Sequence, residues 1–265
     1  MFSITELKEQ LKKFCKQDGK VVIVHSSLRA IGAVEGGGEA LLSLLIEYFT
    51  KNDGLLCIPS HTWISMKLDL RNYDSCLGIL SSIAASHPLG TRSLHPTHSM
   101  VVFGEKNRVE KFIENERFAD TPTNPSGCYG NIIAEDGYVL LLGVDHTKNT
   151  LIHCIEEMLN VPGRLTTDQI ETTIISKSGE EVKRKLFWFD ESEIPDVSLH
   201  FGKFEPAFRY YDCICDGVLG NAPSQFCSAK KMKEVIELIY KNANGQELLA
   251  DNLPLEPELY KIKEL

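Results

Sequence analysis

The chain has 265 residues, of which 43% are hydrophobic and 25% are charged, and its formal net charge is −9. This composition is typical of a globular protein, and no stretch approaches the roughly 18 consecutive apolar residues of a membrane-spanning helix. The negative charge disfavours nucleic acid as a partner and favours a cationic ligand. The first fifteen residues mix Lys and Glu with isolated apolar positions, which predicts an amphipathic helix and not a secretory signal. We therefore expect a cytoplasmic protein with neither a membrane nor a nucleic acid as partner.

The cysteines point to the same compartment. They are scattered along the chain, and no two of them form a CxxC pair. Without such a pair or an export signal, a reducing compartment is a better interpretation than a disulfide framework. Most of these side chains are expected to be small buried hydrophobes. The eight are Cys15, Cys57, Cys76, Cys128, Cys154, Cys213, Cys215 and Cys227.

Helical and strand patterns alternate along the first 165 residues, which predicts an α/β fold. The expected helices are 4–16 (capped by Thr5), 39–50, 77–86 (ended by His87-Pro88), 107–118 and one that begins near Thr150. The expected strands are 21–25, 55–60, 99–104 and 138–144, and the expected loops are 26–38 and 121–130.

The last hundred residues have a different pattern. Residues 171–190 alternate in polarity and turn at Ser178-Gly179, as a β-hairpin does. The segment SAKKMKEVIELIYKN, nearer the end, is a charged amphipathic helix. We expect a single compact α/β unit over residues 1–265, with a mixed sheet flanked by helices and an additional antiparallel β portion in the C-terminal half.

The strongest candidate for chemistry is the segment NTLIHCIEE, which opens the helix after the strand 138–144. Residues three apart on a helix share a face, so His153 lies one turn from Thr150 and one turn from Glu156. A carboxylate at that spacing can hold an imidazole in one tautomer and raise its basicity. The helix also follows the carboxyl end of a strand, where open α/β sheets bind ligands. The alternative is a histidine that is packed within a surface helix.

A second candidate is the segment VVIVHSSLRAIG, which is followed by three glycines at 36–38. A strand that ends in small polar residues exposes successive backbone N–H groups, which can cradle a phosphate or another anion. The segment has neither the GK[ST] of a P-loop nor a GxGxxG pattern. The alternative is a flexible turn in which Ser26 caps the next segment.

A third candidate is RSLHPTHSM, in which His95 and His98 are three apart. With His25 and His61 elsewhere in the chain, a metal site has to be considered. Pro96 breaks the helical geometry, and no carboxylate or cysteine stands nearby at a regular ligand spacing, so we expect no metal. Hydrogen bonding to a polar ligand is the better interpretation.

Two cysteines are candidate nucleophiles. Cys154 adjoins His153, but neighbouring residues on a helix point about 100° apart, so this histidine is poorly placed to activate that thiol. Cys128 is expected on a loop, and the sequence supplies no base beside it. Both are therefore expected to be structural.

Taken together, these segments resemble the aminoglycoside 3-N-acetyltransferase family. The resemblance runs from about residue 20 to residue 165, in the order and spacing of the family, and it is looser at 201–209 and 217–227. The matching segments are HSSLRAIG, SHTW, RSLHPTHS, TPTNPSGCYG and VLLLGVDHTKNTLIHCIEEMLNVPGR.

The resemblance implies transfer of an acetyl group from acetyl-CoA to an amine, by direct attack in a ternary complex and without a metal or an acyl-enzyme. It places the general base on His153, its carboxylate partner on Glu156, and a hydroxyl near the thioester carbonyl on Thr150. It implies a CoA-binding and catalytic half at 1–165 and an acceptor-shaping half at 166–265. The implied CoA contacts are Ser26, Ser27, Leu28, Ser93, His98 and Ser99.

The acceptor is less defined. Carboxylates that could bind further ammonium groups of a cationic amino sugar are Asp69, Asp74, Asp145 and Asp190. The alternatives are an acyltransferase for another amine, such as a nucleotide-linked amino sugar, a non-catalytic member of the fold, and a hydrolase that depends on a metal or a cysteine. The sequence leaves open the acyl chain length, a role in antibiotic resistance, and the oligomeric state, for which a homodimer is one option.

Overall fold

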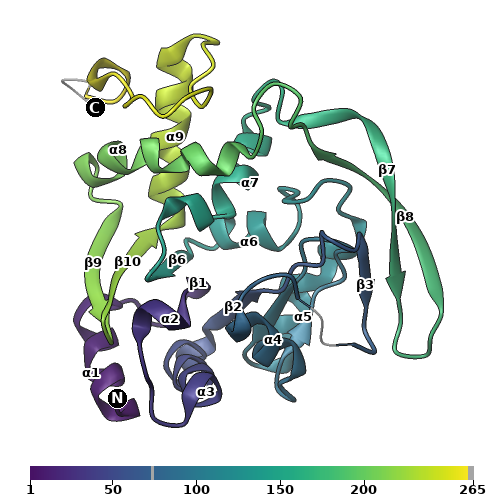
Figure 1. Ribbon diagram of the computed structural model, residues 1–265, viewed down its shortest axis with the longest axis vertical. Coiled ribbons are helices and arrows are strands. Elements are labelled where there is room, and N and C mark those ends of the chain that lie inside the picture. Colours follow the sequence, from purple (N-terminus) through teal and green to yellow (C-terminus); the bar gives the residue numbers. More distant parts are fainter. Residues whose placement is uncertain (73–74, 262–265) are drawn as a thin grey trace.

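A seven-stranded mixed sheet forms the centre of the computed structural model, which describes residues 1–72 and 75–261 (Figure 1). Its strand order is β4-β5-β2-β1-β6-β10-β9. The central strand β1 is parallel to β2 and to β6, whereas the outer pairings are antiparallel. The strands are β1 (Val21–Ser26), β2 (Leu55–Pro59), β4 (Thr91–Arg92), β5 (Met100–Phe103), β6 (Tyr138–Leu142), β9 (Ile214–Leu219) and β10 (Ala222–Ser228).

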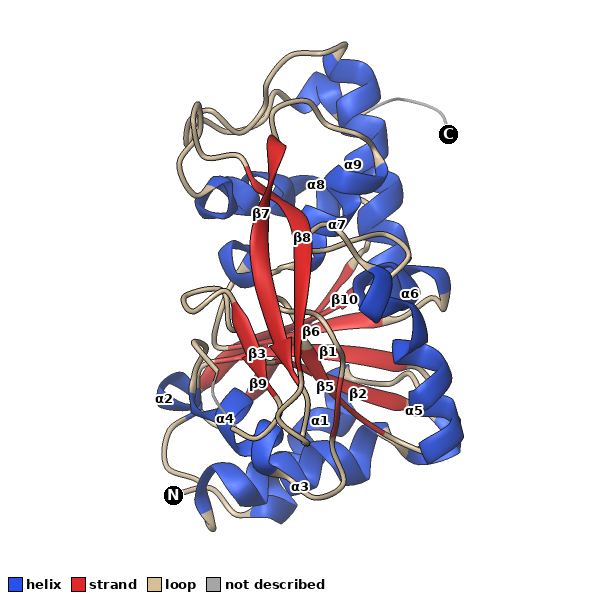
Figure 2. Ribbon diagram, turned by 90° about the vertical axis from the view of Figure 1, so that its right-hand side faces the viewer, coloured by secondary structure: helices blue, strands red, loops and turns tan. Residues whose placement is uncertain are grey.

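Helices cover both faces of this sheet, so that each face carries its own hydrophobic core (Figure 2). This explains why β2 and β5 are buried at every position and read as continuous apolar runs. One face packs against α1 (Ile4–Phe14), α2 (Leu28–Ile31), α3 (Gly37–Phe49) and α4 (Ile79–Ser86). The other packs against α5 (Lys106–Ile113), α6 (Cys128–Ala134), α7 (Leu151–Met158), α8 (Glu205–Tyr210) and α9 (Ala229–Ala243).

A smaller sheet forms an arm along one side of the molecule (Figures 1 and 2). Its strand order is β3-β7-β8, with bounds β3 (Lys67–Asp69), β7 (Leu165–Ile175) and β8 (Glu181–Phe189). The β7/β8 hairpin turns where the sequence predicts, and Gly179 adopts φ 90° there, a conformation that glycine tolerates best. Phe187 donates its amide to the Asp120 carbonyl, and Arg184 donates to the Ala119 carbonyl, which ties the hairpin to the body.

Short 3-10 helices complete the chain. They are η1 (Lys51–Asp53), η2 (Glu114–Phe118), η3 (His146–Lys148), η4 (Val197–Phe204) and η5 (Pro257–Leu259). The predicted α/β class, with a mixed sheet between helices and an additional β portion, is confirmed. Because β10 pairs with β6, strands from both halves of the sequence belong to one sheet, and the division of roles at residue 165 stays a prediction.

Four local predictions were wrong. Ser3, not Thr5, caps α1: its hydroxyl accepts from the Glu6 amide while the Glu6 carboxylate accepts from the Ser3 amide, a reciprocal capping box. The expected loop 26–38 contains α2, and α3 already begins at Gly37. The expected loop 121–130 ends at Cys128, where α6 begins. The expected helix 107–118 changes to 3-10 geometry at Glu114.

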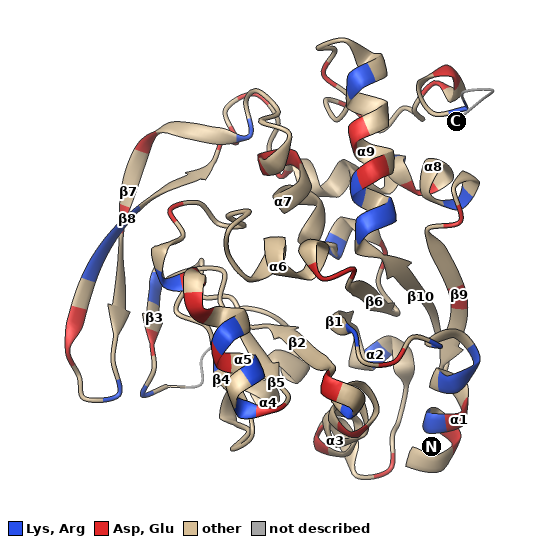
Figure 3. Cartoon of the chain, turned by 180° about the vertical axis from the view of Figure 1, so that it is seen from behind, with Lys and Arg blue, Asp and Glu red and all other residues tan. Residues whose placement is uncertain are grey.

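Acidic and basic residues are interspersed over the outer helices and the hairpin (Figure 3). Among the helices that the structure describes, none has both the length and the apolar character to cross a bilayer.

Candidate active site

A cavity of about 730 Å³ opens where the carboxyl ends of β1, β2 and β6 meet. Parallel strands end at the same edge of a sheet, and open α/β sheets bind their ligands there. The floor is formed by strand ends and by the start of α7, and one wall is formed by the end of the hairpin and the segment that follows it. The residues that line the cavity include His25, Ser26, Pro59, His61, Trp63, His98, Lys148, Asn149, Thr150, His153, Arg164, Trp188, Phe189, Asp190, Glu191, Asp196 and Ser198.

His153 lies on the first turn of α7 and faces this cavity. Its ring stacks on Phe189, with 4.3 Å between ring centroids, and meets Phe201 edge-on at 4.7 Å. Burial between these rings lowers the pKa of His153 to about 3, although Asp196 acts in the opposite direction. Its Nδ1 atom is buried and has no hydrogen-bond partner among the described residues. The imidazole is therefore neutral and has unused hydrogen-bonding capacity.

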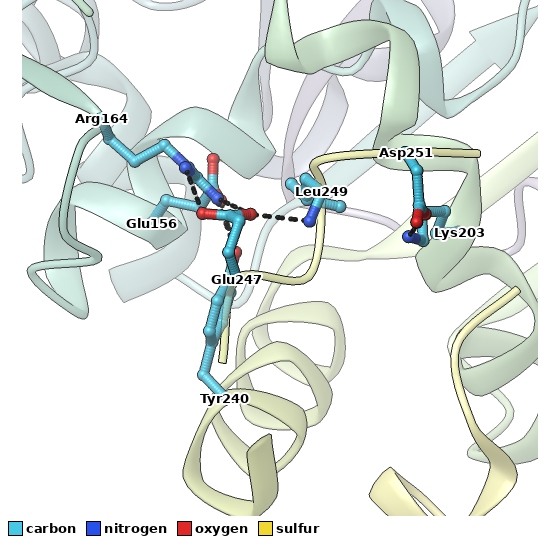
Figure 4. A network of polar contacts seen from close by, with 7 residues as sticks. All are labelled: Glu156, Arg164, Lys203, Tyr240, Glu247, Leu249 and Asp251. Atoms are coloured by element: carbon cyan, nitrogen blue, oxygen red, sulfur yellow. Dashed lines mark hydrogen bonds and ion pairs between the residues drawn. The ribbon is translucent and has the colours of Figure 1, made fainter. Parts of the chain in front are cut away.

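Glu156 lies one turn further along α7, with 1% of its surface exposed. Its Oε1 accepts from Arg164 Nε at 2.8 Å and from the Tyr240 hydroxyl at 2.6 Å (Figure 4). Burial raises the pKa of Glu156, and the charge of Arg164 and the hydrogen bonds from Tyr240 and Arg164 oppose that rise. Its Oε2, like Nδ1 of His153, has no partner among the described residues. The predicted hydrogen bond between Glu156 and His153 is therefore not formed here, and the pairing stays a prediction.

Thr150 precedes α7 at the N-cap position but does not cap it with its side chain. Its backbone is already helical, with φ −57° and ψ −21°, whereas a capping residue is usually extended. The side chain lines the cavity on the same helix as His153. Burial raises the pKa of the neighbouring Tyr129 phenol, and a hydrogen bond with Thr150 acts in the opposite direction. The threonine hydroxyl is thus not committed to the helix end, and it lies at the cavity wall.

Three of the predicted candidate histidines divide into two kinds. His61 and His98 line the cavity with their ring centroids 4.4 Å apart, and His61 Nε2 lies 2.8 Å from the Tyr129 hydroxyl. His95 instead lies in the interior: its Nε2 contacts the Thr121 carbonyl at 2.9 Å, and its Nδ1 accepts from the His98 amide at 2.9 Å. Burial lowers the pKa of all three. No group of three or more metal-ligating side chains comes together in the part of the chain that the structure describes.

The predicted CoA contacts are only partly at the cavity. Ser26 and His98 line it. Ser27 builds the turn after β1, because its amide donates to the Leu142 carbonyl and its hydroxyl accepts from the Ala30 amide. Ser93 and Ser99 are fully buried.

The hydroxyls of the two buried serines already form hydrogen bonds within the protein. That of Ser93 accepts from the Met100 amide, and that of Ser99 donates to the Ser60 carbonyl at 2.8 Å. Leu28 is partly buried and packs against the hydrophobic core on the α1–α4 face of the sheet. For Ser27, Leu28, Ser93 and Ser99, contact with CoA stays a prediction, and their observed contacts shape the loops around the cavity.

Among the predicted acceptor carboxylates, Asp190 lines the cavity. Asp145 caps η3 by accepting from the Thr147 amide, and Asp69 pairs with Arg71 at 2.8 Å on the arm. Asp74 lies outside the described residues. Glu191 and Asp196 line the cavity beside Asp190, although they were not predicted.

The cysteines are free thiols, and all but Cys76 and Cys215 are buried, as expected for small hydrophobes. The prediction that Cys128 lies on a loop was wrong: it is the first residue of α6. Burial raises the pKa of the Cys128 and Cys154 thiols well above the usual range. Neither thiol has the features of an activated nucleophile.

Sequence reasoning missed several residues that form the site. Trp188 and Phe189 come from the end of β8, and Phe201 comes from η4. The only signal for Trp188 and Phe189 in the sequence is that aromatic residues interrupt the alternation of the hairpin just before it ends. Arg164 and Tyr240, which hold Glu156, are far apart in the chain, and no local pattern could connect them.

Comparison with known proteins identifies the class. A family model described as Aminoglycoside 3-N-acetyltransferase matches residues 23–240. The chain belongs to this family.

Individual relatives agree. The SPbeta prophage-derived aminoglycoside N(3')-acetyltransferase-like protein YokD of Bacillus subtilis is 28% identical over 176 residues, which is 57% of this chain and 63% of that protein. Aminoglycoside N(3)-acetyltransferase IV of Salmonella sp is 31% identical over 164 residues, 59% of each chain. The aligned segment thus spans about three fifths of these two curated relatives.

Solved structures share the fold. Aminoglycoside acetyltransferase AAC(3)-Xa superimposes with a TM-score of 0.75 at 21% identity, covering 88% of this chain and 90% of that chain. AAC-IIIb, solved as a binary complex with CoASH, gives 0.72 at 19% identity and covers 88% and 94%. At this identity the likeness establishes the architecture alone.

Proposed function

We propose that this protein is an acetyl-CoA-dependent N-acetyltransferase that acetylates an amine of an aminoglycoside-type amino sugar, with His153 as general base. The observation that carries the proposal is the His153 imidazole, which lines a large cavity at the sheet edge and has a ring nitrogen with no hydrogen-bond partner among the described residues. Family membership supports the reaction class.

The chain's own residues supply the steps that such a reaction needs. An alkylamine is mostly protonated near neutral pH, and it cannot attack until its lone pair is free. A neutral imidazole can take the proton, and a base positioned in this way contributes about 10²–10⁴-fold. Burial keeps His153 neutral in the free protein. The amine nitrogen then bonds to the thioester carbon, the C–S bond breaks, and CoA leaves as the thiolate, so that no acyl-enzyme is required.

The carbonyl oxygen gains negative charge during this attack. Thr150 lines the cavity one helical turn from His153, and its hydroxyl is not used as a helix cap. A donor in that position stabilises the developing charge by roughly 3 kcal/mol in comparable sites. Thr150 is therefore assigned to the thioester oxygen. Alignment of both substrates in one cavity supplies much of the remaining rate.

Three carboxylates favour a cationic acceptor. Asp190, Glu191 and Asp196 line the cavity on the side of the hairpin end. They would attract further ammonium groups of a polyamine sugar. In agreement, a histidine-to-alanine mutant of AAC(3)-IVa, 24% identical with a TM-score of 0.68, was solved in complex with apramycin.

The donor and the location are supported in a similar way. AAC-IIIb was solved as a binary complex with CoASH, and it shares the fold of this chain. A cytoplasmic location is part of the proposal and agrees with eight unpaired cysteines, because thiols stay reduced in that compartment.

The test combines calorimetric titration with acetyl-CoA and an assay of free-thiol release against a panel of aminoglycosides and amino sugars. We expect saturable acetyl-CoA binding and thiol release with at least one aminoglycoside. Release only with another amine, such as a nucleotide-linked amino sugar, would retain the acyltransferase and change the acceptor. If acetyl-CoA does not bind, the proposal is wrong.

A further inference from the structure

The network that holds Glu156 has a consequence for the proposed reaction. The imidazole of His153 is desolvated, and burial lowers its pKa to about 3, which makes it a weak base. To accept a proton from the amine it needs a compensating negative charge close by. The contacts of Glu156, Arg164, Tyr240 and Glu247 show how the fold supplies that charge (Figure 4).

Both donors of the network bind the same carboxylate oxygen. Arg164 Nε and the Tyr240 hydroxyl donate to Oε1 of Glu156, at 2.8 and 2.6 Å. Oε2 has no partner among the described residues, although an ionised carboxylate can accept on both oxygens. On the same helix face, one turn away, Nδ1 of His153 is buried and also unpartnered there. An acceptor and a potential donor are thus left unused side by side on α7, and buried polar atoms seldom remain unpaired without a reason.

Arg164 alone would cancel the charge of Glu156. The structure prevents this with a second carboxylate, because both terminal nitrogens of Arg164 donate to Glu247 at 2.9 Å. Burial acts to raise the pKa of Glu247, but the Arg164 guanidinium and the backbone amides of Leu248 and Leu249 lower it overall. One guanidinium therefore lies between two carboxylates. With both carboxylates ionised, the group carries one surplus negative charge, which a protonated His153 would neutralise.

Other charged groups also act on the pKa of His153, and one of them, Asp196, is a carboxylate that lines the same cavity. Arg164 acts to lower the pKa of His153, and Asp196, which precedes η4, acts to raise it. His61 and His98, from the loops on the other side of the cavity, are themselves kept neutral by burial. Within the described residues, Glu156 is the buried carboxylate on the same helix and face as His153.

We propose that Tyr240, Arg164 and Glu247 are positioning residues for the acetyl transfer, and that they fix Oε1 of Glu156 so that Oε2 receives the Nδ1–H of His153 when the base is protonated. This inference rests on the proposed function, because it assigns a task to the proposed base. It leaves Nε2 as the ring nitrogen that takes the proton from the amine. It also gives a task to α9 and to the segment after it, which lie outside the region of strongest resemblance.

The central test is a double-mutant cycle. Tyr240→Phe removes one hydroxyl and keeps the ring that packs against Phe204. We expect kcat to fall about tenfold, as for a lost hydrogen bond to a charged group, with the KM for acetyl-CoA changed less than about twofold. In a Glu156→Gln background, the same substitution should cause no further fall. Glu247→Gln should behave like Tyr240→Phe.

A matched control uses the same segment of chain. Asp251 pairs with Lys203 at 2.8 Å and ties the segment after α9 to η4 without contacting Glu156 (Figure 4). Asp251→Asn should leave kcat unchanged. An equal loss from Tyr240→Phe in both backgrounds, or an equal loss in Asp251→Asn, would show a merely structural role and overturn the inference.

A second readout does not need turnover. The ring ¹⁵N signals of His153 report its tautomer and hydrogen bonding, and we expect Tyr240→Phe to shift them while Asp251→Asn does not. If wild-type protein binds acetyl-CoA but acetylates no amine, the proposed function fails and the ¹⁵N signals still test the positioning. If those signals are identical in wild type and Tyr240→Phe, the positioning is wrong even when the enzyme is active.

Discussion

His95 and His153 occupy two regions of the molecule that treat a buried imidazole in opposite ways. His95 lies in the loop between β4 and β5, where its Nε2 contacts the Thr121 carbonyl and its Nδ1 accepts from the amides of Thr97 and His98. His153 is enclosed by Phe189 and Phe201, and its Nδ1 has no partner among the described residues. Burial lowers the pKa of both, to about 4 and about 3.

The difference shows that burial and a shifted pKa do not by themselves mark a reactive histidine. In the loop, each ring nitrogen of His95 is hydrogen-bonded to backbone groups, so the imidazole acts as a cross-link between chain segments. In α7, the ring is held by aromatic contacts that leave its Nδ1 unused, and a cavity lies in front of it. Unused hydrogen-bonding capacity beside a cavity distinguishes the candidate base from the structural residue.

The largest expected effect is on turnover. His153→Ala should lower kcat by about 10²–10⁴-fold, because the amine then loses its proton acceptor. The KM for acetyl-CoA should change little, and the free energy of unfolding should fall less than in His95→Ala, since the ring contacts with Phe189 and Phe201 are lost but no polar partner among the described residues is left unpaired. Steady-state kinetics between about pH 6 and 9 would measure this. If His153→Ala kept wild-type turnover across that range, His153 would not be the base, and its contrast with His95 would be wrong.

The second effect is on folding. His95→Ala leaves the Thr121 carbonyl and the amides of Thr97 and His98 unpaired and opens a cavity, so the free energy of unfolding should fall by about 3 kcal/mol. Urea denaturation would measure it. His200, whose contact with Asn252 lies at the surface, provides the control, and His200→Ala should cost far less. Equal losses at the two positions would contradict the role of His95 as a cross-link.

His95 and His153 should make the free energy of unfolding depend on pH in the same way. The pKa of each is lower in the folded state than the ordinary value of 6.5, so the unfolded chain binds more protons as the pH falls. The stability that they contribute is complete above pH 6.5 and is lost as the pH falls toward about 4 and about 3. Either His95→Gln or His153→Gln should reduce the slope of unfolding free energy against pH, between about pH 4.5 and 6, by about 1.4 kcal/mol per pH unit.

Another buried group makes the free energy of unfolding depend on pH in the opposite direction. Glu116 is buried, which raises its pKa to about 7, so its contribution is present at low pH and is lost as the pH rises toward 7. His25 and His146, with pKa values lowered to about 3 and about 4, act in the same direction as His95 and His153. Comparison of each variant with wild type cancels these constant contributions. An unchanged slope in both variants would show that the two rings are not neutral in the folded protein.

The smallest effect concerns Thr97, whose hydroxyl lies 3.0 Å from His98 Nδ1 and 3.3 Å from His95 Nδ1. Thr97→Val should lower the free energy of unfolding by about 1 kcal/mol, since His95 keeps its backbone partners. Its effect on kcat should be smaller than that of His153→Ala by more than an order of magnitude. If Thr97→Val instead lost much of its turnover at normal stability, His98 would take part in the chemical step and not only in binding.

The sequence by itself determined the segments that form β1, β2, β5 and β6 of the large sheet, whereas β4, β9 and β10 were not predicted. The runs at 21–25, 55–60 and 138–144 are apolar at nearly every position, and such segments become strands that are covered on both faces. The spacing of Thr150, His153 and Glu156 likewise placed three residues on one face of a helix, because helical geometry is local. The family resemblance, which rests on motifs in a fixed order, was also confirmed.

Only the tertiary structure decided what surrounds those residues. Arg164 and Tyr240 are separated by 76 positions, and they meet at Glu156 because β7 leaves the body there and α9 packs beside α7. Ser93 and Ser99 are predicted CoA contacts, and only the structure shows that the Ser93 hydroxyl accepts from the Met100 amide and that the Ser99 hydroxyl donates to the Ser60 carbonyl of a distant segment. Secondary structure and helix faces follow from interactions between near neighbours in the chain. The partners of a buried charge depend on distant segments that pack together, and no local pattern encodes them.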